Sequence, residues 1–409
     1  MAATKELRRT MPALVAGFTI AIIFGAVLSI VLTAAGPRGI GLSDPRTSGW
    51  IAMIYGLPMI PSLFLSLRHR MPLLLTGNVF ALIFFASLGG RNSFGELTAA
   101  AMVAGAIVLA TALLGITGRL ATWIPIPIVQ GLIAGAVLPF LVNVFSALST
   151  GGEAGAEVPI MVGAAVVAYL LGQRAFGARL PAVLPAFLAG LALAAVTGQL
   201  GGLPALEFPS FELVRPELSW TAVLTVTPVL LAVMTVQSNI PSVIYLRSQG
   251  FDPPERLINV VSGAGTVVGS IFGPVTVSLA LPPLLLAAGP TAGDPAIRYR
   301  AVFLPVVAGL LVAILAGTAA DLAVLMPPVL LLTMAGLALL PALVAALRQM
   351  TVGPLVLGPL VAFAIALSKM SIAGLGPFFW SLVVGTAVSL LLERDGVREL
   401  RAGTSDRGT

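Results

Sequence analysis

The sequence Arg70-Met71-Pro72-Leu73-Leu74-Leu75-Thr76-Gly77-Asn78-Val79-Phe80 has a counterpart half a chain later, Ile271-Phe272-Gly273-Pro274-Val275-Thr276-Val277-Ser278-Leu279-Ala280. In each, a proline is followed by residues of high strand propensity, and small hydroxyl, glycine or amide residues lie within an apolar stretch. Irregular backbone at membrane depth is tolerated only where it is buried in protein or lines a cavity. Interrupted spans at matching places in two halves are typical of a transporter's substrate site.

The two halves also match outside these segments. Ala335-Gly336 follows Pro328 at the spacing at which Ala134-Gly135 follows Pro127, and this offset is close to the one between Pro72 and Pro274. The chain therefore contains a weak internal repeat of about half its length.

Composition places the chain in a membrane. Of its 409 residues, 58% are hydrophobic and 9% are charged, and the mean hydropathy is +1.06, whereas soluble domains average roughly 25% charged residues. Apolar runs able to cross about 30 Å of hydrocarbon lie near 11–35, 48–66, 72–89, 96–117, 124–146, 157–176, 181–200, 218–240, 256–272, 273–289, 299–320, 323–346, 352–368 and 373–392. They predict an all-α polytopic membrane protein with about 14 spans. About twelve or thirteen spans fit if the boundaries at 66–72, 272–273 and 320–323 fall otherwise.

Basic residues predict the topology. With both termini cytoplasmic, only a few basic residues fall outside, namely Arg38, Arg46, Arg91, Arg215 and Lys369. This is the positive-inside bias, so we expect a multi-pass protein of the cell inner membrane, with the lipid bilayer around it. The basic residues form no patch or motif, which argues against a nucleic-acid partner.

Catalysis and metal binding have little support in the sequence. There is no cysteine and only one histidine, and no set of acid, base, nucleophile and metal ligand converges, so we expect neither an enzyme nor a cofactor or metal site. Every carboxylate falls in a predicted loop, terminus or span end. Proton-coupled carriers usually keep an ionisable group inside the membrane. The candidates for coupling are therefore His69, between Arg68 and Arg70, and Asp321, in a turn predicted between spans 11 and 12.

Polar residues inside the spans are the candidates for substrate binding. Gln237, Ser238 and Asn239 precede Pro241 within span 8, and such groups are costly in hydrocarbon unless they face protein or water. We expect Asn78, Gln237 and Ser278 to line one cavity, and Gln130 to make a helix–helix hydrogen bond. Phe18, Tyr55, Phe80 and Phe272 could flank an aromatic ring. The binding candidates are Thr76, Gly77, Asn78, Gln237, Asn239, Phe272, Thr276, Ser278, Phe18 and Tyr55.

An anion fits this arrangement best. If spans 3 and 10 are half-helices whose amino-terminal ends meet near the midplane, their unsatisfied amides and dipoles attract a carboxylate. The stretch from 201 to 218 should lie along the outer surface, and the polar tail from Glu393 to Thr409 is too short to fold.

Four motifs in the second half carry a family resemblance. They are Thr235-Val236-Gln237-Ser238-Asn239-Ile240-Pro241, the stretch Gly289-Pro290-Thr291-Ala292-Gly293-Asp294-Pro295-Ala296-Ile297-Arg298-Tyr299-Arg300, Leu325-Met326-Pro327-Pro328 with Ala335-Gly336-Leu337-Ala338-Leu339-Leu340-Pro341, and Gly374-Leu375-Gly376-Pro377-Phe378-Phe379-Trp380. In order and spacing they resemble the benzoate:proton symporter family, which is similar in plan to the uracil/xanthine and sulfate permeases.

The resemblance implies a 7+7 inverted repeat with short strands at half-helices 3 and 10. It implies a core domain made of 1–120 and 206–321, a gate domain made of 121–205 and 322–409 with a short cytoplasmic tail, and elevator-type alternating access. A homodimer through the gate domain is left open.

The implied function is secondary active transport of a small organic anion, benzoate or a related aromatic carboxylate. Two departures bear on the substrate. Uracil-type permeases carry acidic residues where this chain has Val236 beside Gln237, and Pro282 with Pro283, while the family's Asn-Leu-Ala is here Ser278-Leu279-Ala280. The alternatives are a nucleobase or inorganic anion transporter, or an anion channel, of the same fold.

Overall fold

The computed structural model describes residues 2–36, 39–88, 90–117, 125–149, 157–176, 181–199, 205–325, 327–368, 370–372 and 375–405. Arg38 and Lys369, two of the basic residues predicted outside, lie beyond these ranges. The first half contains α1 (Ala2–Ala35), α2 (Asp44–Gly56), α3 (Met59–His69), β1 (Leu75–Gly77), α4 (Val79–Ser87), α5 (Phe94–Leu113), α7 (Ile126–Ser149), α8 (Glu157–Phe176) and α9 (Val183–Val196).

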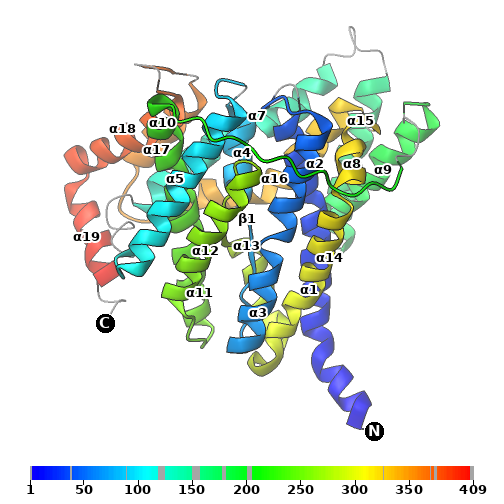
Figure 1. The fold of residues 1–409 in the computed structure, drawn as a ribbon, viewed down its shortest axis with the longest axis horizontal. Coiled ribbons are helices and arrows are strands. Elements are labelled where there is room, and N and C mark those ends of the chain that lie inside the picture. The colour runs from blue at the N-terminus through cyan, green and yellow to red at the C-terminus, as the bar shows by residue number, and fades with distance from the viewer. Residues whose placement is uncertain are drawn as a thin grey trace.

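The second half repeats this order with more interruptions (Figure 1). It contains α10 (Trp220–Leu231), the π-helix η1 (Ala232–Asn239), α11 (Ile240–Ser248), α12 (Glu255–Gly269), η2 (Ser270–Phe272), β2 (Val277–Leu279), α13 (Leu281–Ala287), η3 (Pro290–Ala292), η4 (Pro295–Val302), α14 (Phe303–Ile314), α15 (Ala316–Leu325), α16 (Pro328–Met350), α17 (Leu357–Leu367), α18 (Pro377–Leu392) and α19 (Arg394–Ser405).

Helix length and composition confirm a polytopic helical membrane protein. Among the described residues, 8 helices are long and apolar enough to cross a membrane, or up to 9 if the bent pair Pro377–Leu392 and Arg394–Leu400 is one span. Two shorter apolar helices, Val183–Val196 and Leu357–Leu367, add to these. Spans 3 and 10 are each part strand and part helix, so they escape a test for continuous helices. The total of about 14 stays a prediction.

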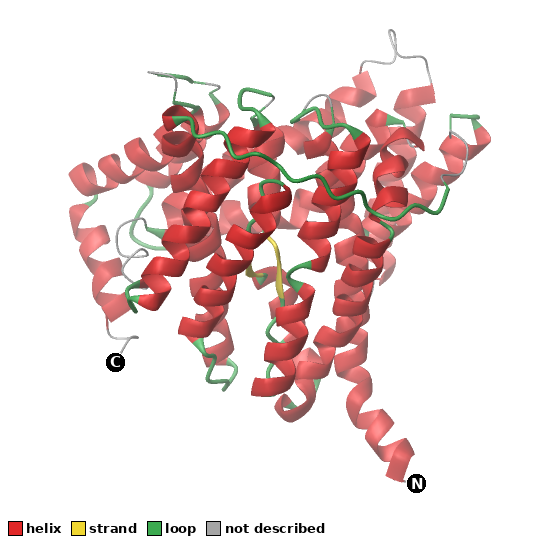
Figure 2. Ribbon diagram, in the orientation of Figure 1, coloured by secondary structure: helices red, strands yellow, loops and turns green. Residues whose placement is uncertain are grey.

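The two interrupted segments meet as an antiparallel strand pair in the middle of the molecule (Figure 2). Leu75 pairs with Leu279, Thr76 with Ser278, and Gly77 with Val277. The pairing extends by one hydrogen bond at each end, from the Asn78 amide to the Thr276 carbonyl (2.8 Å) and from the Ala280 amide to the Leu74 carbonyl (3.1 Å). The expected strands at half-helices 3 and 10 are confirmed.

The strand pair is symmetric about its centre. The offset that separates Pro72 from Pro274 also separates Asn78 from Ala280, the residues that precede α4 and α13. The two terminal hydrogen bonds of the pair exchange under this offset, as an inverted repeat requires. The weak repeat in the sequence is therefore an approximate twofold relation centred on the strands.

Hydroxyl groups from the preceding helix brace each strand. On α3, the Ser62 hydroxyl accepts a hydrogen bond from the Leu75 amide (2.8 Å), and the Ser66 hydroxyl accepts one from the Leu73 amide (3.0 Å). The second strand is braced in a similar way by α12 and the residue that follows it. The Thr266 hydroxyl accepts a hydrogen bond from the Val277 amide (2.9 Å), and the Ser270 hydroxyl donates one to the Val275 carbonyl (3.2 Å). Backbone groups of the crossing are thus satisfied inside the protein.

Gly77 allows the first strand to approach α2. A Cβ atom at this position would lie 2.5 Å from Ile54 Cγ2 and 3.0 Å from the Ile54 carbonyl oxygen. Glycine is required here for close packing and not for an unusual backbone angle.

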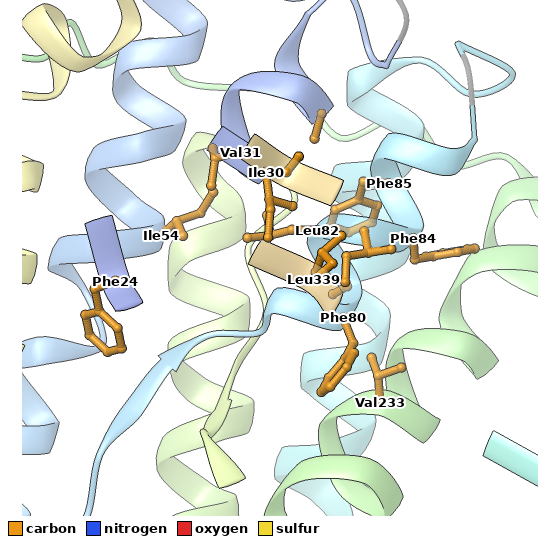
Figure 3. Close-up of a cluster of buried hydrophobic side chains, with 14 of the residues drawn as sticks. Phe24, Ile30, Val31, Ile54, Phe80, Leu82, Phe84, Phe85, Val233 and Leu339 are labelled. Carbon is orange, nitrogen blue, oxygen red and sulfur yellow. The ribbon is translucent and has the colours of Figure 1, made fainter. Parts of the chain in front are cut away.

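The helices pack in two sets around the strands. In one set, α5 packs on α10 and α12, and α14 packs on α1 and α2; in the other, α7 packs on α16, α17, α18 and α8. Helix α4 contributes the buried rings Phe80, Phe84 and Phe85 to the apolar cluster drawn in Figure 3, beside Ile30 and Leu339. Helix α1 also packs on α16, across the two sets, and the core and gate domains remain a prediction.

A long extended stretch crosses one face of the molecule between α9 and α10 (Figure 1). Its described part makes a salt bridge from Glu212 to Arg46 on α2 (3.0 Å), and the Val214 amide donates to the Ile271 carbonyl (2.9 Å). For residues 205–218, the described part of the stretch, the prediction that it lies along the surface is confirmed.

The prediction that the tail is too short to fold is wrong. Helix α19 follows α18 after a bend of 105°, and Glu393 lies at the bend. Its carboxylate accepts hydrogen bonds from the amides of Val356 (2.6 Å), Leu357 (2.8 Å) and Gly358 (3.0 Å) at the start of α17, and from the Ser389 hydroxyl (2.9 Å). Burial opposes ionisation of Glu393, but these hydrogen bonds hold its pKa below its ordinary value. A carboxylate at a helix start is stabilising because it satisfies free amides.

We expect Glu393→Ala to lower the stability of the purified protein by about 1 kcal/mol, the usual cost of losing a cap. Because the pKa of Glu393 is lowered on folding, its contribution is fully present above the ordinary value of 4.5 and is lost as the pH falls below it. Thermal unfolding at several pH values measures this. Glu399→Ala, on the exposed face of α19, is the matched control. Equal losses in the two variants would contradict the capping role.

Candidate functional site

Asn78 lies where the first strand becomes α4, and both ends of its side-chain amide are used. The Oδ1 atom accepts hydrogen bonds from the amides of Phe80 (2.9 Å) and Ala81 (3.1 Å), which caps α4. The Nδ2 atom donates to the hydroxyls of Ser238 and Ser278 (both 2.9 Å) and lies 3.2 Å from the Val233 carbonyl. Asn78 therefore joins α4, β2 and η1 at a single buried point.

The π-helix η1 presents polar residues to the strands. Its last three residues are Gln237, Ser238 and Asn239, and single turns of π-helix are frequent at functional sites. Asn239 donates to Asn259 (2.9 Å) and to Ser262 (3.1 Å) on α12, and accepts from the Leu279 amide of β2 (2.8 Å). This helix is thus fixed both to α12 and to the second strand.

Gln237 points the other way, towards α7. The Gln130 side chain on α7 donates a hydrogen bond to Gln237 Oε1, and both residues are buried. The expected helix–helix hydrogen bond of Gln130 is confirmed. It connects the two sets of helices directly beside the strand pair.

The side chains at this polar centre, formed by Asn78, Ser238, Ser278, Gln237 and Gln130, are all uncharged and buried. They offer amide and hydroxyl donors without a fixed charge. Within the described part of the chain, no group of three His, Asp or Glu residues is placed to hold a metal ion. The centre is suited to binding a small polar or anionic group by hydrogen bonds.

The amino-terminal ends of the half-helices α4 and α13 do not present the free amides that were expected to attract a carboxylate. At α4 the Asn78 side chain already accepts from the amides of Phe80 and Ala81. Helix α13 starts with Leu281-Pro282-Pro283 and has no side-chain cap, and proline has no N–H to donate. Most donors at the centre therefore come from side chains, with the α4 dipole behind Asn78.

The structure brings most of the candidate binding residues together. Thr76, Gly77, Asn78, Thr276 and Ser278 lie on or beside the paired strands. Gln237 and Asn239 adjoin them through η1, as described above. Asn78 and Ser278 are in direct contact, whereas Gln237 contacts Gln130.

The other candidates lie elsewhere. Tyr55 is buried and donates to the Phe24 carbonyl (2.8 Å). Phe18 is 55% exposed, on a stripe of α1 shared with Met11 and Val15. Phe272 packs edge-on against Phe211 of the surface stretch, with ring centroids 5.5 Å apart. None of these three makes a described contact with the polar centre.

The two coupling candidates lie outside the polar centre. His69 is the last residue of α3. Asp321 lies within α15, so the expected turn at this position is wrong. Small, strongly helical residues surround Asp321, and they continue a helix where the single charge indicated a break.

Ser238 is the residue that the sequence-based list of binding candidates lacks. Its position between Gln237 and Asn239 was a signal, but only the π-helix turns its hydroxyl towards Asn78. A regular helical period would not indicate which member of the trio faces the strands.

A multi-pass helical membrane protein whose two interrupted spans meet in a strand pair has the inverted-repeat architecture of a transporter. Solved structures share this fold. The structure of SLC26A9 matches with a TM-score of 0.61 and 14% identity over 93% of this chain and 64% of that one. The transmembrane domain of the cyanobacterial bicarbonate transporter BicA matches with a TM-score of 0.55 and 16% identity over 94% of this chain and 97% of that one.

Sequence comparison gives the family. Residues 8–391 match the benzoate membrane transport protein family, and the chain belongs to it. It is 26% identical, over 94% of its length and 95% of the other, to the benzoate membrane transport protein of Acinetobacter baylyi. It is 24% identical, over 93% and 96%, to the inner membrane protein YdcO of Escherichia coli. The predicted family is confirmed, and the chain is a membrane transporter and not an enzyme.

Asn78 should affect stability as well as binding, because it caps α4. Asn78→Ala removes the cap and leaves two buried hydroxyls without a donor, so we expect a loss of about 1–2 kcal/mol. Asn78→Ser keeps an oxygen that can cap and should recover part of this loss. Thermal unfolding without ligand measures both. Asn92→Ala, whose amide lies 3.4 Å from Glu96, is the control; no difference between wild type and Asn78→Ala would contradict the capping geometry.

Proposed function

We propose that this protein is a secondary active transporter of a small organic anion, benzoate or a related aromatic carboxylate. The observation that carries the proposal is the buried, uncharged polar centre at the strand crossing. The hydroxyls of Ser238 and Ser278, which Asn78 positions, can donate to a carboxylate, and hydrogen bonds to a charged group are about twice as strong as neutral ones. Membership in a family named for benzoate supports this substrate class.

The surroundings of the centre support an aromatic substrate. Phe80 follows Asn78 by two residues on α4 and lies near Val233 of η1 in Figure 3. Its ring is 8% exposed, so an apolar wall stands beside the donors. A planar ring against this wall would leave its carboxylate directed at Asn78.

We further propose alternating access by movement of the core domain against the gate domain. The strand pair, η1 and α12 are tied together by hydrogen bonds and would move as one body. The hydrogen bond between Gln130 and Gln237 is the polar contact of this body with α7, and it would have to break during the movement. We also propose inner-membrane insertion with both termini cytoplasmic, and we leave a homodimer through the gate domain as a proposal for cross-linking to test.

A second candidate function is transport of an inorganic anion. The architectural likeness to a bicarbonate transporter favours it, since a centre of hydroxyl and amide donors also suits a small oxyanion. A channel of the same fold would show no counterflow of labelled substrate, whereas a carrier would.

The acid should bind and its neutral analogue should not. We expect benzoate to bind much more tightly than benzamide in titration calorimetry at neutral pH. Asn78→Ala should weaken benzoate binding by about 1.5–3 kcal/mol. Asn78→Asp keeps an oxygen that can cap α4 but places a negative charge beside the substrate carboxylate, so it should abolish benzoate binding. Equal affinity for benzoate and benzamide would rule out an anion site and favour a nucleobase-like substrate.

Proton coupling should be weak. Asp and Glu are absent from the polar centre, so no carboxylate there is placed to carry a proton with the substrate. We expect an imposed proton gradient to steepen uptake only slightly in proteoliposomes. Measuring substrate and proton flux with His69→Gln and Asp321→Asn, singly and together, tests the two candidates. Strict one-to-one coupling in the double variant would show that another proton path exists.

A further inference from the structure

A cavity lies between the two sets of helices, at the far end of α4 from Asn78. It has a volume of about 240 Å³ and is lined by residues of α1, α4, α7, α16, α17 and α18. Ser87 lies at its edge, at the carboxyl end of the nine-residue helix that begins beside Asn78. At a rise of about 1.5 Å per residue, the cavity is roughly 13 Å from the polar centre along α4.

One of the side chains that line this cavity is positively charged. Arg91 lines it from the loop after α4, and Asn143 lines it from α7. Both side chains are exposed, and within the described part of the chain no hydrogen bond or ion pair is made by either. Thr33 and Ser87 also line the cavity, but their hydroxyls donate to carbonyls of their own helices, Ser29 (2.7 Å) and Phe84 (2.6 Å). Arg91 and Asn143 are thus the polar groups left to bind a ligand.

The remaining wall is apolar and aromatic. Phe140 and Phe378 line the cavity, and Phe378 packs edge-on against the buried ring of Phe84, with centroids 5.1 Å apart. Phe84 follows Phe80 by one helical turn on α4 (Figure 3). These rings provide an apolar surface for a planar ring.

We propose that this cavity is a second binding site, a vestibular subsite that captures an aromatic carboxylate before it reaches the polar centre. The inference rests on the proposed function and extends it to a site that the strand crossing does not include. The Arg91 guanidinium and the Asn143 amide would hold the carboxylate, and Phe140 and Phe378 would flank the ring. Pockets for drug-sized ligands are about 300–1,000 Å³, so a cavity of about 240 Å³ suits a single-ring acid.

The location gives the subsite a role in transport. Its lining comes from α1 and α4 on one side and from α7, α16, α17 and α18 on the other. Movement of one set against the other would change the distance from Arg91 to Asn143. A ligand held by both would therefore be bound in one arrangement of the domains and released in the other.

The chain has no cysteine, so one introduced thiol reports on the cavity alone. We expect benzoate to slow the reaction of Ser87→Cys with N-ethylmaleimide in purified protein. Protection should persist when Asn78→Ala is added, because the subsite does not use Asn78. It should need about three- to tenfold more benzoate when Arg91→Gln is added, since a tenfold change corresponds to about 1.4 kcal/mol. Arg215→Cys, on the surface stretch, is the control and should react equally with and without benzoate.

Two results would overturn the subsite. Protection that disappears with Asn78→Ala would show that binding at the polar centre alone closes the cavity. Protection unchanged by Arg91→Gln would show that the Arg91 guanidinium does not bind the carboxylate. In either case, calorimetric benzoate binding by the wild type would leave the proposed function standing, whereas no binding of any aromatic acid would overturn both.

Uptake kinetics give a second readout. Arg91→Gln should raise KM about three- to tenfold with little change in kcat. Arg215→Gln removes the same charge from the surface stretch and should change neither. An equal rise in KM for both variants would indicate general attraction of anions to the surface and would overturn a local site.

Discussion

Pairing of two short strands inside the protein is the constraint on which the rest of the structure depends. Neither interrupted span can satisfy its own backbone, and an unsatisfied amide or carbonyl in hydrocarbon costs several kcal/mol. Each strand uses one edge to bond the other and turns its second edge to side chains of neighbouring elements. Ser62 and Ser66 serve β1, and Thr266 and Asn239 serve β2. The two halves must therefore fold around each other, since each completes the other's hydrogen bonding.

The same requirement explains which parts of the fold could be predicted from sequence. Prolines, strand-forming residues and small polar residues in two matching segments indicated the two broken spans. Because the segments occupy equivalent places in the internal repeat, they were also expected to meet. The boundaries of α15 and α19 could not be predicted so well. The single charge of Asp321 led to the prediction of a turn, and the polar composition after Glu393 led to the prediction of an unfolded tail. At α19 tertiary contacts decided, through Glu393 binding the amides of α17, whereas at Asp321 the helix-forming neighbours outweighed the single charge.

The site was predictable in composition but not in orientation. Asn78, Gln237 and Ser278 were expected to line one cavity; Asn78 and Ser278 are in contact, whereas Gln237 bonds Gln130. The sequence could not indicate that Asn78 would cap α4 with one end of its amide and hold two serines with the other, because this depends on a π-helix placing Ser238. Phe18, Tyr55 and Phe272 show the opposite case. An aromatic residue in an apolar helix has no sequence signal that separates packing from binding, and here each packs or faces outward.

The approximate symmetry of the strands makes their chemical asymmetry informative. Asn78 and Ala280 occupy equivalent places before α4 and α13, yet only Asn78 has a side chain that can cap and donate. Pro282 and Pro283 also remove amide donors from the start of α13. The donors and the helix dipole are therefore concentrated on the α4 side of the crossing. Because α4 ends at the cavity lined by Arg91, this one helix connects the two polar regions. A substrate held at the amino end of α4 would therefore move together with the part of the cavity lining that α4 contributes.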